Sequence, residues 1–189
     1  MSLRVRNAAL LALMSVGASP LQAQMWTPTL DANWGYGGEQ AIWFDLPTEK
    51  WDEANDAVVQ ADGKVVIVGF ARKAPLGGSG DVSDLTVTRL SANGSLDTTF
   101  ASSGKLSANF GSGGRSADVA NGVTLDTSGR IYVAGYTETG YGHCGIVLRY
   151  GSNGVLDSSY GNAGKALLCD GNGAGIVYHD IAIDAQGRA

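Results

Sequence analysis

Three similar copies of a ten-residue string occur in this chain of 189 residues. It reads LDANWGYGGE from Leu30, LDTTFASSGK from Leu96 and LDSSYGNAGK from Leu156, so each copy has Leu-Asp and an aromatic residue at its fifth place. The last two copies lie 60 residues apart, and an arginine followed by an Asn-Gly pair recurs at the same spacing, from Arg89 and from Arg149. A repeat of this length indicates stacked supersecondary units that cover one another's hydrophobic faces.

The repeats differ in length at one place. Turn glycines recur at Gly63, Gly129 and Gly187, but 26 residues separate Gly63 from Arg89, whereas 20 separate Gly129 from Arg149. The six extra residues fall within ARKAPLGGSGDVSD, residues 71–84. Extra length is best tolerated in an exposed connection, because the cost of closing a loop grows only as the logarithm of its length. We therefore predict an exposed loop at 71–84 and, because function on a repeated scaffold resides where units differ, a binding surface there.

Each unit is predicted to contain four β-strands. In the first unit these are the alternating stretch at 57–60, the apolar stretch at 64–70, residues 85–90 and residues 104–110. The second strand is apolar on successive residues, which indicates burial on both faces. The pairs Asn93-Gly94 and Asn153-Gly154 predict tight hairpins of type I′. The fold class is therefore all-β, with tandem four-stranded blades of a β-propeller, in preference to a β-helix or a β-sandwich.

The strings DGKVVIVGF, RLSANGSLDTTFASSGK, SGRIYVAGY and RYGSNGVLDSSYGNAGK resemble the delta-60 repeat family. That resemblance covers about residues 30–189 and implies propeller-like repeats of exported bacterial proteins, with no established molecular activity. The expected divisions are a partial unit at about 30–55, repeats at about 56–119 and 120–178, and a truncated repeat at 179–189. The stretch at 32–51, which precedes the strands of the first unit, departs from the pattern through two extra tryptophans and a proline. We expect an incomplete propeller whose further blades belong to a missing C-terminal part.

The first 23 residues read as a signal peptide, because Arg4 and Arg6 precede an apolar run from Ala8 to Ala18 and cleavage is expected after Ala23. The run is too short to span a membrane, so we expect residues 24–189 to be secreted, periplasmic or on the cell surface. Cleavage leaves 11 basic and 18 acidic residues, a net charge of −7. An acidic chain without a basic cluster is a poor partner for nucleic acid.

Cys144 and Cys169 are the only cysteines, and an oxidising compartment permits one disulfide between them. Buried apolar cysteines or free thiols are the alternative. Neither cysteine has ligand-like spacing to His143 or His179, so no metal site is predicted. Calcium stays open as a cofactor only through two weak matches to calcium-binding loops, GGSGDVSDL at 77–85 and DGNGAG at 170–175. No other cofactor is expected.

Residues that could carry chemistry recur with the repeat. Asp31, Asp97 and Asp157 follow the leucine of each string, and a carboxylate needed in every unit is better explained by turn hydrogen bonds than by catalysis. The same reasoning assigns Trp34, Phe100 and Tyr160 to the core between blades, and Arg89 and Arg149 to partly buried hydrogen-bonded pairs. His143 and His179 do not recur, and without a partner each is expected on a surface or loop.

No GxSxG or HExxH motif is present, so no catalytic residue is predicted. The sequence favours a non-catalytic exported repeat protein, a structural or interaction module for a protein or glycan partner. The alternative is a carbohydrate-active hydrolase or lyase of propeller type whose catalytic residues lie outside this chain.

Overall fold

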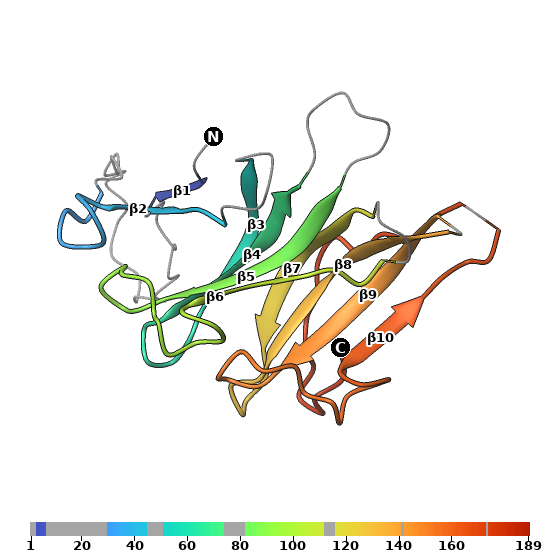
Figure 1. Ribbon diagram of the computed structural model, residues 1–189. Coiled ribbons are helices and arrows are strands. Elements are labelled where there is room, and N and C mark those ends of the chain that lie inside the picture. Colours follow the sequence, from blue (N-terminus) through green and yellow to red (C-terminus); the bar gives the residue numbers. More distant parts are fainter. Residues whose placement is uncertain are drawn as a thin grey trace, which may run out of the picture.

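The computed structural model describes residues 3–6, 30–44, 51–73, 82–111, 116–140, 142–172 and 174–189. These residues form strands and turns, arranged as two four-stranded antiparallel sheets and one two-stranded sheet (Figure 1). The first large sheet contains β3 (Asp52–Val59), β4 (Val65–Arg72), β5 (Ser83–Leu90) and β6 (Lys105–Ala108) in the order of the chain. We call this sheet the first blade.

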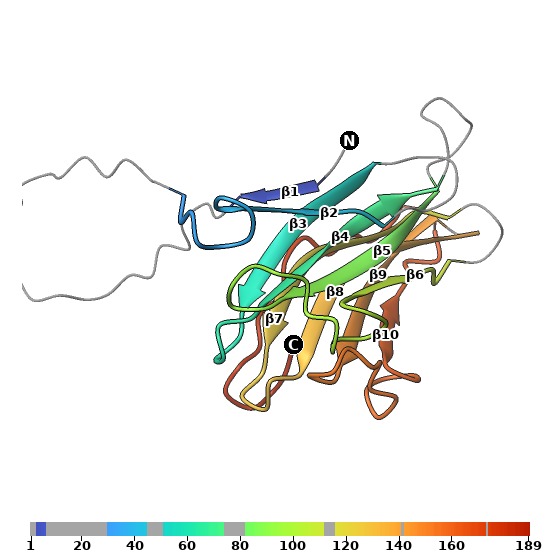
Figure 2. The same ribbon diagram turned by 60° about the vertical axis from the view of Figure 1, so that its left-hand side comes forward.

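The second blade repeats this arrangement one unit later. It contains β7 (Asp118–Leu125), β8 (Ile131–Thr139), β9 (Gly142–Tyr150) and β10 (Lys165–Leu168), again in the order of the chain. The all-β prediction with tandem four-stranded blades is therefore confirmed. The two blades do not close into a ring, as the two views in Figures 1 and 2 show.

The first copy of the string leads into a strand that belongs to neither blade. β2 (Glu39–Ile42) follows its string as β6 and β10 follow theirs, and it pairs with β1 (Leu3–Arg6). β1 lies within the predicted signal peptide, whose cleavage site lies outside the described residues. The signal peptide stays a prediction, and cleavage after Ala23 would leave β2 without this partner.

The innermost strands begin earlier than the sequence pattern predicts. β3 begins at Asp52 and β7 at Asp118, whereas the repeats were expected from about 56 and 120. Both strands contain a bulge after their third residue, between Ala54 and Asp56 and between Ala120 and Gly122. Residues 52–55 of β3 read Asp-Glu-Ala-Asn, so the hydrophobic alternation that indicates a strand is missing before position 56 although the alternation of burial continues through it.

The bulges explain one recurring glycine in each blade. Gly69 of β4 and Gly135 of β8 lie opposite the bulged strand, where a Cβ atom would come within 1.8 Å of the Glu53 carbonyl oxygen and 1.9 Å of the Val119 carbonyl oxygen. A side chain at either position would collide with the neighbouring backbone. The repeated Gly-aromatic pair at the end of the second strand is therefore a packing requirement.

The hydrophobic core lies between the blades, as a propeller requires. Alternate residues of β4 and β5 face alternate residues of β8 and β9 across the interface. The fully buried members from both sheets are Val66, Val68, Leu85, Val87, Ala120, Ile131, Val133, Ile146 and Leu148. A smaller cluster around Ile67 and Leu90 covers the other face of the first blade with Ile42 of β2. Each blade is thus buried through its neighbours.

The repeated string forms the contact between one unit and the next. The Phe100 ring is fully buried and lies over Gly154 of the following unit, and Trp34 lies over Gly94 in the same way. A Cβ atom on Gly154 would sit 2.8 Å from the Phe100 ring. The backbone joins at the same points, because Gly35 N–H donates to the Asn93 carbonyl (2.8 Å) and Ala101 N–H to the Asn153 carbonyl (2.9 Å).

The Asn-Gly turns differ from the predicted type I′ hairpin. Gly94 and Gly154 have positive φ values of 83° and 81°, but Asn93 and Asn153 do not have positive φ. Each asparagine instead accepts the N–H of the residue two places on, at 3.1 Å, through its side-chain oxygen. The asparagine is selected for this side-chain turn and the glycine for its left-handed backbone.

Residues 176–178, which lead into the truncated third repeat, lie along β8 and β9 of the second blade. Ile176 N–H donates to the His143 carbonyl (2.8 Å) and Tyr178 N–H to the Gly135 carbonyl (3.3 Å). Residues 184–188 then form the same turn as residues 60–64 and 126–130. No helix of the described residues is long and apolar enough for a membrane span.

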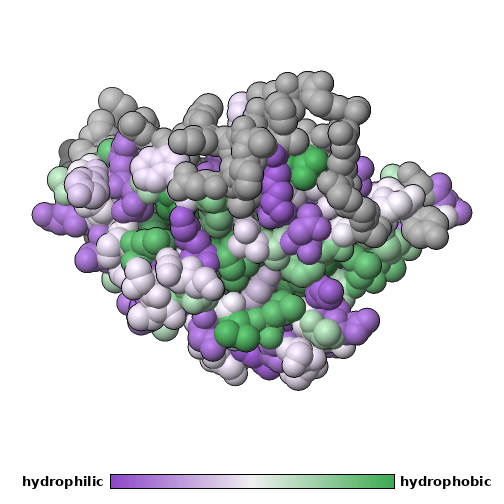
Figure 3. Space-filling model, in the orientation of Figure 1, coloured by the Kyte–Doolittle hydropathy of each residue, from purple (hydrophilic) through white to green (hydrophobic). Residues whose placement is uncertain are grey.

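The exposed surface mixes hydrophobic and hydrophilic residues. Figure 3 shows hydrophobic patches interrupted by hydrophilic side chains. Exposed large hydrophobic residues of the second blade include Val155, Leu167 and Leu168. Ile42, the counterpart of Leu168, is buried where the next blade covers it.

We predict that Phe100→Ala lowers the free energy of unfolding by ~3–5 kcal/mol, because it removes a fully buried ring from the contact between units. Urea denaturation followed by circular dichroism measures this change. Tyr36→Ala is the control, because Tyr36 is 90% exposed and its removal should change stability by less than about 0.5 kcal/mol. Equal losses for the two variants would contradict the proposed packing.

Candidate functional site

The two ends of the blades carry different kinds of residues. The turn end holds the Gly turns, the Asn-Gly turns and the repeated strings, at 60–64, 91–104, 126–130 and 151–164. The loop end holds the connections from β4 to β5, from β6 to β7 and from β8 to β9, together with the start of β3 and β7. The repeat is concentrated at the turn end, and the loop end is where the units differ.

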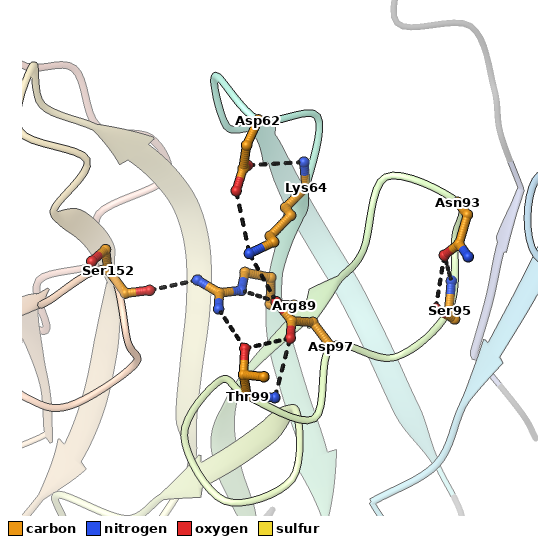
Figure 4. Close-up of polar contacts among 8 residues, drawn as sticks. All are labelled: Asp62, Lys64, Arg89, Asn93, Ser95, Asp97, Thr99 and Ser152. Atoms are coloured by element: carbon orange, nitrogen blue, oxygen red, sulfur yellow. Dashed lines mark hydrogen bonds and ion pairs between the residues drawn. The ribbon is translucent and has the colours of Figure 1, made fainter.

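At the turn end, Asp97 is the centre of a hydrogen-bond network (Figure 4). Its Oδ1 accepts the Thr99 hydroxyl (2.6 Å) and the Thr99 N–H (3.1 Å). Its Oδ2 accepts Arg89 Nε (2.9 Å) and lies 3.4 Å from Lys64 Nζ. The hydrogen bond from the Thr99 hydroxyl is the main reason that the pKa of Asp97 falls to about 2, in opposition to the effect of burial.

Arg89 extends this network to the next unit. Its Nη1 donates to the carbonyl of Ser152, at the start of the following Asn-Gly turn, and its guanidinium lies 4.7 Å from the Phe100 ring centre. The arginine therefore holds its own string and the neighbouring turn together. This is a structural role for a buried pair, which leaves no accessible anion site at Arg89.

The second unit repeats the pair with greater exposure. Arg149 Nε donates to Asp157 Oδ2 (2.8 Å), and Asp157 Oδ1 accepts the Ser159 hydroxyl (2.7 Å). The Arg149 guanidinium lies 4.9 Å from the Tyr160 ring centre, as Arg89 lies over Phe100. In the first copy, Asp31 Oδ1 likewise accepts the Asn33 N–H (3.0 Å). All three string aspartates are thus turn acceptors.

At the loop end, two buried carboxylates were missed by the sequence analysis. Asp118 is fully buried, and its Oδ1 accepts the Phe110 N–H (3.2 Å), as Asp52 Oδ2 accepts the Phe44 N–H (3.0 Å). Burial raises the pKa of Asp118. Asp84 is also buried and pairs with Lys73 Nζ at 2.6 Å. The 66-residue spacing of Asp52 and Asp118 matches that of Gly63 and Gly129, and this was the available signal.

The inner strands are joined by an asparagine ladder, defined as Asn55 and Asn121. Asn55 Nδ2 donates to the Ala120 carbonyl (2.8 Å), and Asn121 Nδ2 donates to the Tyr178 carbonyl (2.8 Å), so each asparagine holds the next inner segment. Asp56 adds a second link, because its Oδ2 accepts the Val123 N–H (2.8 Å). In the third copy His179 takes the place of the asparagine.

A pocket of about 300 Å³ opens at the loop end between the two blades. We call it the loop-end pocket. Its walls come from β3, the ends of β4 and β8, the starts of β5 and β7, and residues 177–179. The residues that line it are Asn55, Phe70, Arg72, Ser83, Ala117, Val119, Asn121, Tyr136, Val177 and His179. It therefore combines amide, hydroxyl, guanidinium and aromatic groups, and none of these lining residues carries a carboxylate.

The two described ends of the predicted 71–84 loop lie at this pocket. Arg72 and Ser83 at its two ends line the pocket, whereas residues 74–81 lie outside the described residues. The calcium-like stretch at 77–85 also lies mainly outside them. At 170–175, Asp170 accepts the N–H groups of Asn172 (3.1 Å) and Ala174 (2.9 Å), which gives that Gly-rich stretch a turn role.

The unrepeated histidines and the cysteines also lie at the loop end. The His143 and Tyr136 ring centres are 4.5 Å apart, and His179 is exposed on the wall of the pocket. Cys144 and Cys169 form a disulfide in the structure that joins β9 to the residue after β10. Pairing in the purified protein stays a prediction, which peptide mapping without reduction would test.

Sequence models of two β-propeller families match the chain. One is described as a β-propeller domain of unknown function (DUF5122) and matches residues 60–100 and 127–160. The other is described as a β-propeller repeat (SBBP) and matches residues 110–142. Together with the two antiparallel four-stranded sheets, these matches identify propeller-type repeats. No curated protein matches the chain. The narrower resemblance to the delta-60 family stays a prediction.

We predict that Asp97 makes stability depend on pH. Its pKa is about 2 in the folded protein against an ordinary 3.8, so its stabilising effect is present above about pH 4 and is lost as the pH falls through about 2. The difference corresponds to about 2 kcal/mol. Asp97→Asn should lower the unfolding free energy near neutral pH by about this amount and flatten its decline between pH 4 and pH 2.

Asp157→Asn is the matched variant, because Asp157 has the corresponding arginine and hydroxyl partners in the second unit but no counterpart of the Lys64 pair within the described part of the chain, and its side chain is more exposed, at 24% against 7% for Asp97. Its effect on stability should be smaller, since solvent screens the exposed pair. Urea unfolding at a series of pH values measures both variants. An Asp97→Asn protein with an unchanged pH profile would refute the assignment.

Proposed function

We propose that this protein is a non-catalytic, exported β-propeller module that binds a protein or glycan partner at its loop end. The observation that carries the proposal is the loop-end pocket. The turn-end pairs Arg89–Asp97 and Arg149–Asp157 are engaged in hydrogen bonds that fix the repeated strings, whereas the pocket opens between blades and is lined in part by residues that differ between units, such as Ser83 and His179. Binding sites of this kind combine apolar walls with a few polar groups of fixed position.

The chemistry of the pocket favours binding over turnover. Hydrolysis of a glycosidic bond ordinarily needs two carboxyl groups facing the same substrate. The carboxylate with a raised pKa at this end, Asp118, is fully buried and bonded to the Phe110 N–H, so a substrate does not reach it. The lining residues provide hydrogen-bond donors, hydrogen-bond acceptors and ring faces, which suit recognition.

A glycan array, combined with a screen for hydrolase and lyase activity, tests this proposal on the purified protein. We predict saturable binding without product formation. His179→Ala at the loop end should weaken the binding, whereas Arg188→Ala at the turn end should not, because Arg188 is 77% exposed and pairs only locally with Asp184. Product formation would favour the alternative, a carbohydrate-active enzyme of propeller type.

A further inference from the structure

The strongly charged side chains around the loop-end pocket have partners within the chain. Arg72 of the first blade and Glu138 of the second occupy the same place, because Arg72 N–H donates to the Trp51 carbonyl (3.0 Å) as Glu138 N–H donates to the Ala117 carbonyl (2.9 Å). The Arg72 guanidinium lies 5.8 Å from the Trp51 ring centre and is engaged within the chain. The Glu138 carboxylate accepts the Ala117 N–H (3.2 Å). Recognition at this pocket therefore depends on its amide, imidazole and aromatic groups.

The asparagine ladder uses its hydrogen-bond donors and leaves acceptors in the pocket. Asn55 Nδ2 and Asn121 Nδ2 each donate to a backbone carbonyl of the next inner segment, at 2.8 Å. Asn55 Oδ1 accepts no hydrogen bond within the described part of the chain. Asn121 Oδ1 accepts there only from Asn55 Nδ2, at 3.4 Å, so one of its two lone pairs is left. Both asparagines line the pocket, and they suit a ligand that donates hydrogen bonds.

His179 adds a group that can both donate and accept. It takes the third place after Asn55 and Asn121, is exposed on the wall of the pocket, and makes no hydrogen bond to another described residue. A neutral imidazole donates through one ring nitrogen and accepts through the other. Hydroxyl groups also donate and accept, so adjacent hydroxyls of one ligand match an amide oxygen and an imidazole on neighbouring inner segments.

The apolar part of the pocket includes two aromatic side chains. Phe70 and Tyr136 occupy the same place in the two blades, directly after Gly69 and Gly135. Both are partly buried, and the Tyr136 ring centre lies 4.5 Å from that of His143. A pyranose has C–H groups on its faces and hydroxyls at its edge, so apolar walls can cover a face while amides bind the edge. The volume of about 300 Å³ lies at the small end of ligand pockets, which suits one sugar residue.

We propose that the loop-end pocket binds one residue of a neutral saccharide, whose hydroxyls donate to the Oδ1 atoms of Asn55 and Asn121. This inference rests on the proposed binding function and names its ligand class. A sugar acid fits less well, because an ionised carboxylate only accepts hydrogen bonds and would face amide oxygens that only accept. The net charge of −5 also opposes an anionic ligand.

NMR titration of the purified chain with the methyl glycosides of glucose, galactose and mannose tests the proposal. At least one of these neutral sugars should bind saturably, with a Kd on the order of 1 mM, and shift the backbone amide signals of residues 55, 121 and 177–179. The methyl glycoside of the corresponding uronic acid, which differs by the carboxylate, should bind at least about tenfold more weakly.

Two variants test the pocket groups separately. His179→Ala removes the exposed imidazole, and Phe70→Leu keeps an apolar side chain but removes the ring, so each should weaken binding at least about fivefold. Gln186→Ala is the matched control, because Gln186 is exposed on the same segment as His179 but belongs to the turn at 184–188. Thermal unfolding midpoints close to that of the parent show that the variants are folded.

The outcomes separate this inference from the proposed function. Absence of saturable binding by all three neutral glycosides, or affinity unchanged in both pocket variants, would overturn the saccharide assignment and leave a module for a protein partner. Tighter binding of a uronic acid would overturn the neutral class. Tighter binding of N-acetylglycinamide, which donates peptide N–H groups, would overturn the saccharide in favour of a peptide. Cleavage of a glycoside would contradict the non-catalytic function instead.

Discussion

The structure depends on the seating of an aromatic ring from one unit on a glycine of the next. The Phe100 ring packs on Gly154 and the Trp34 ring packs on Gly94. The aromatic residue of each string therefore contacts the Asn-Gly turn of the next unit. Arg89 reinforces the contact, because it binds Asp97 in its own unit and the Ser152 carbonyl in the next. The blades therefore share one core, since each β-sheet is too thin to bury its own apolar side chains.

Because each unit is stabilised by the next at the turn end, the two ends of the strands have different constraints. The turn end repeats because every unit needs the same string, turn and Arg-Asp pair. The loop end repeats only in part, through the asparagine ladder and the Asp52 and Asp118 acceptors. Residues between these fixed points can change without loss of the blade, as the exchange of Arg72 for Glu138 shows. The pocket lies among such residues.

The sequence predicted the blades because their strands and turns recur as repeated sequence motifs, and the burial of Phe100 was predicted from its position in the repeat. It failed at two places. The first four residues of β3 are mostly polar and carry no hydrophobic alternation, and the type I′ prediction overlooked that the Asn93 side chain can form the turn while only Gly94 has positive φ. The loop-end pocket could not be predicted, because Arg72, Asn121 and His179 meet only when the blades stack.

Native-state hydrogen exchange on a Gly154→Ala variant tests most directly whether units are stabilised by their neighbours. The added Cβ atom would sit 2.8 Å from the Phe100 ring and at a φ of 81°, so it disturbs the contact from the side of the second unit. Our account predicts faster exchange in β4 and β5 of the first blade as well as in the second. Faster exchange confined to the second blade would show that the units are stable independently and would contradict the account.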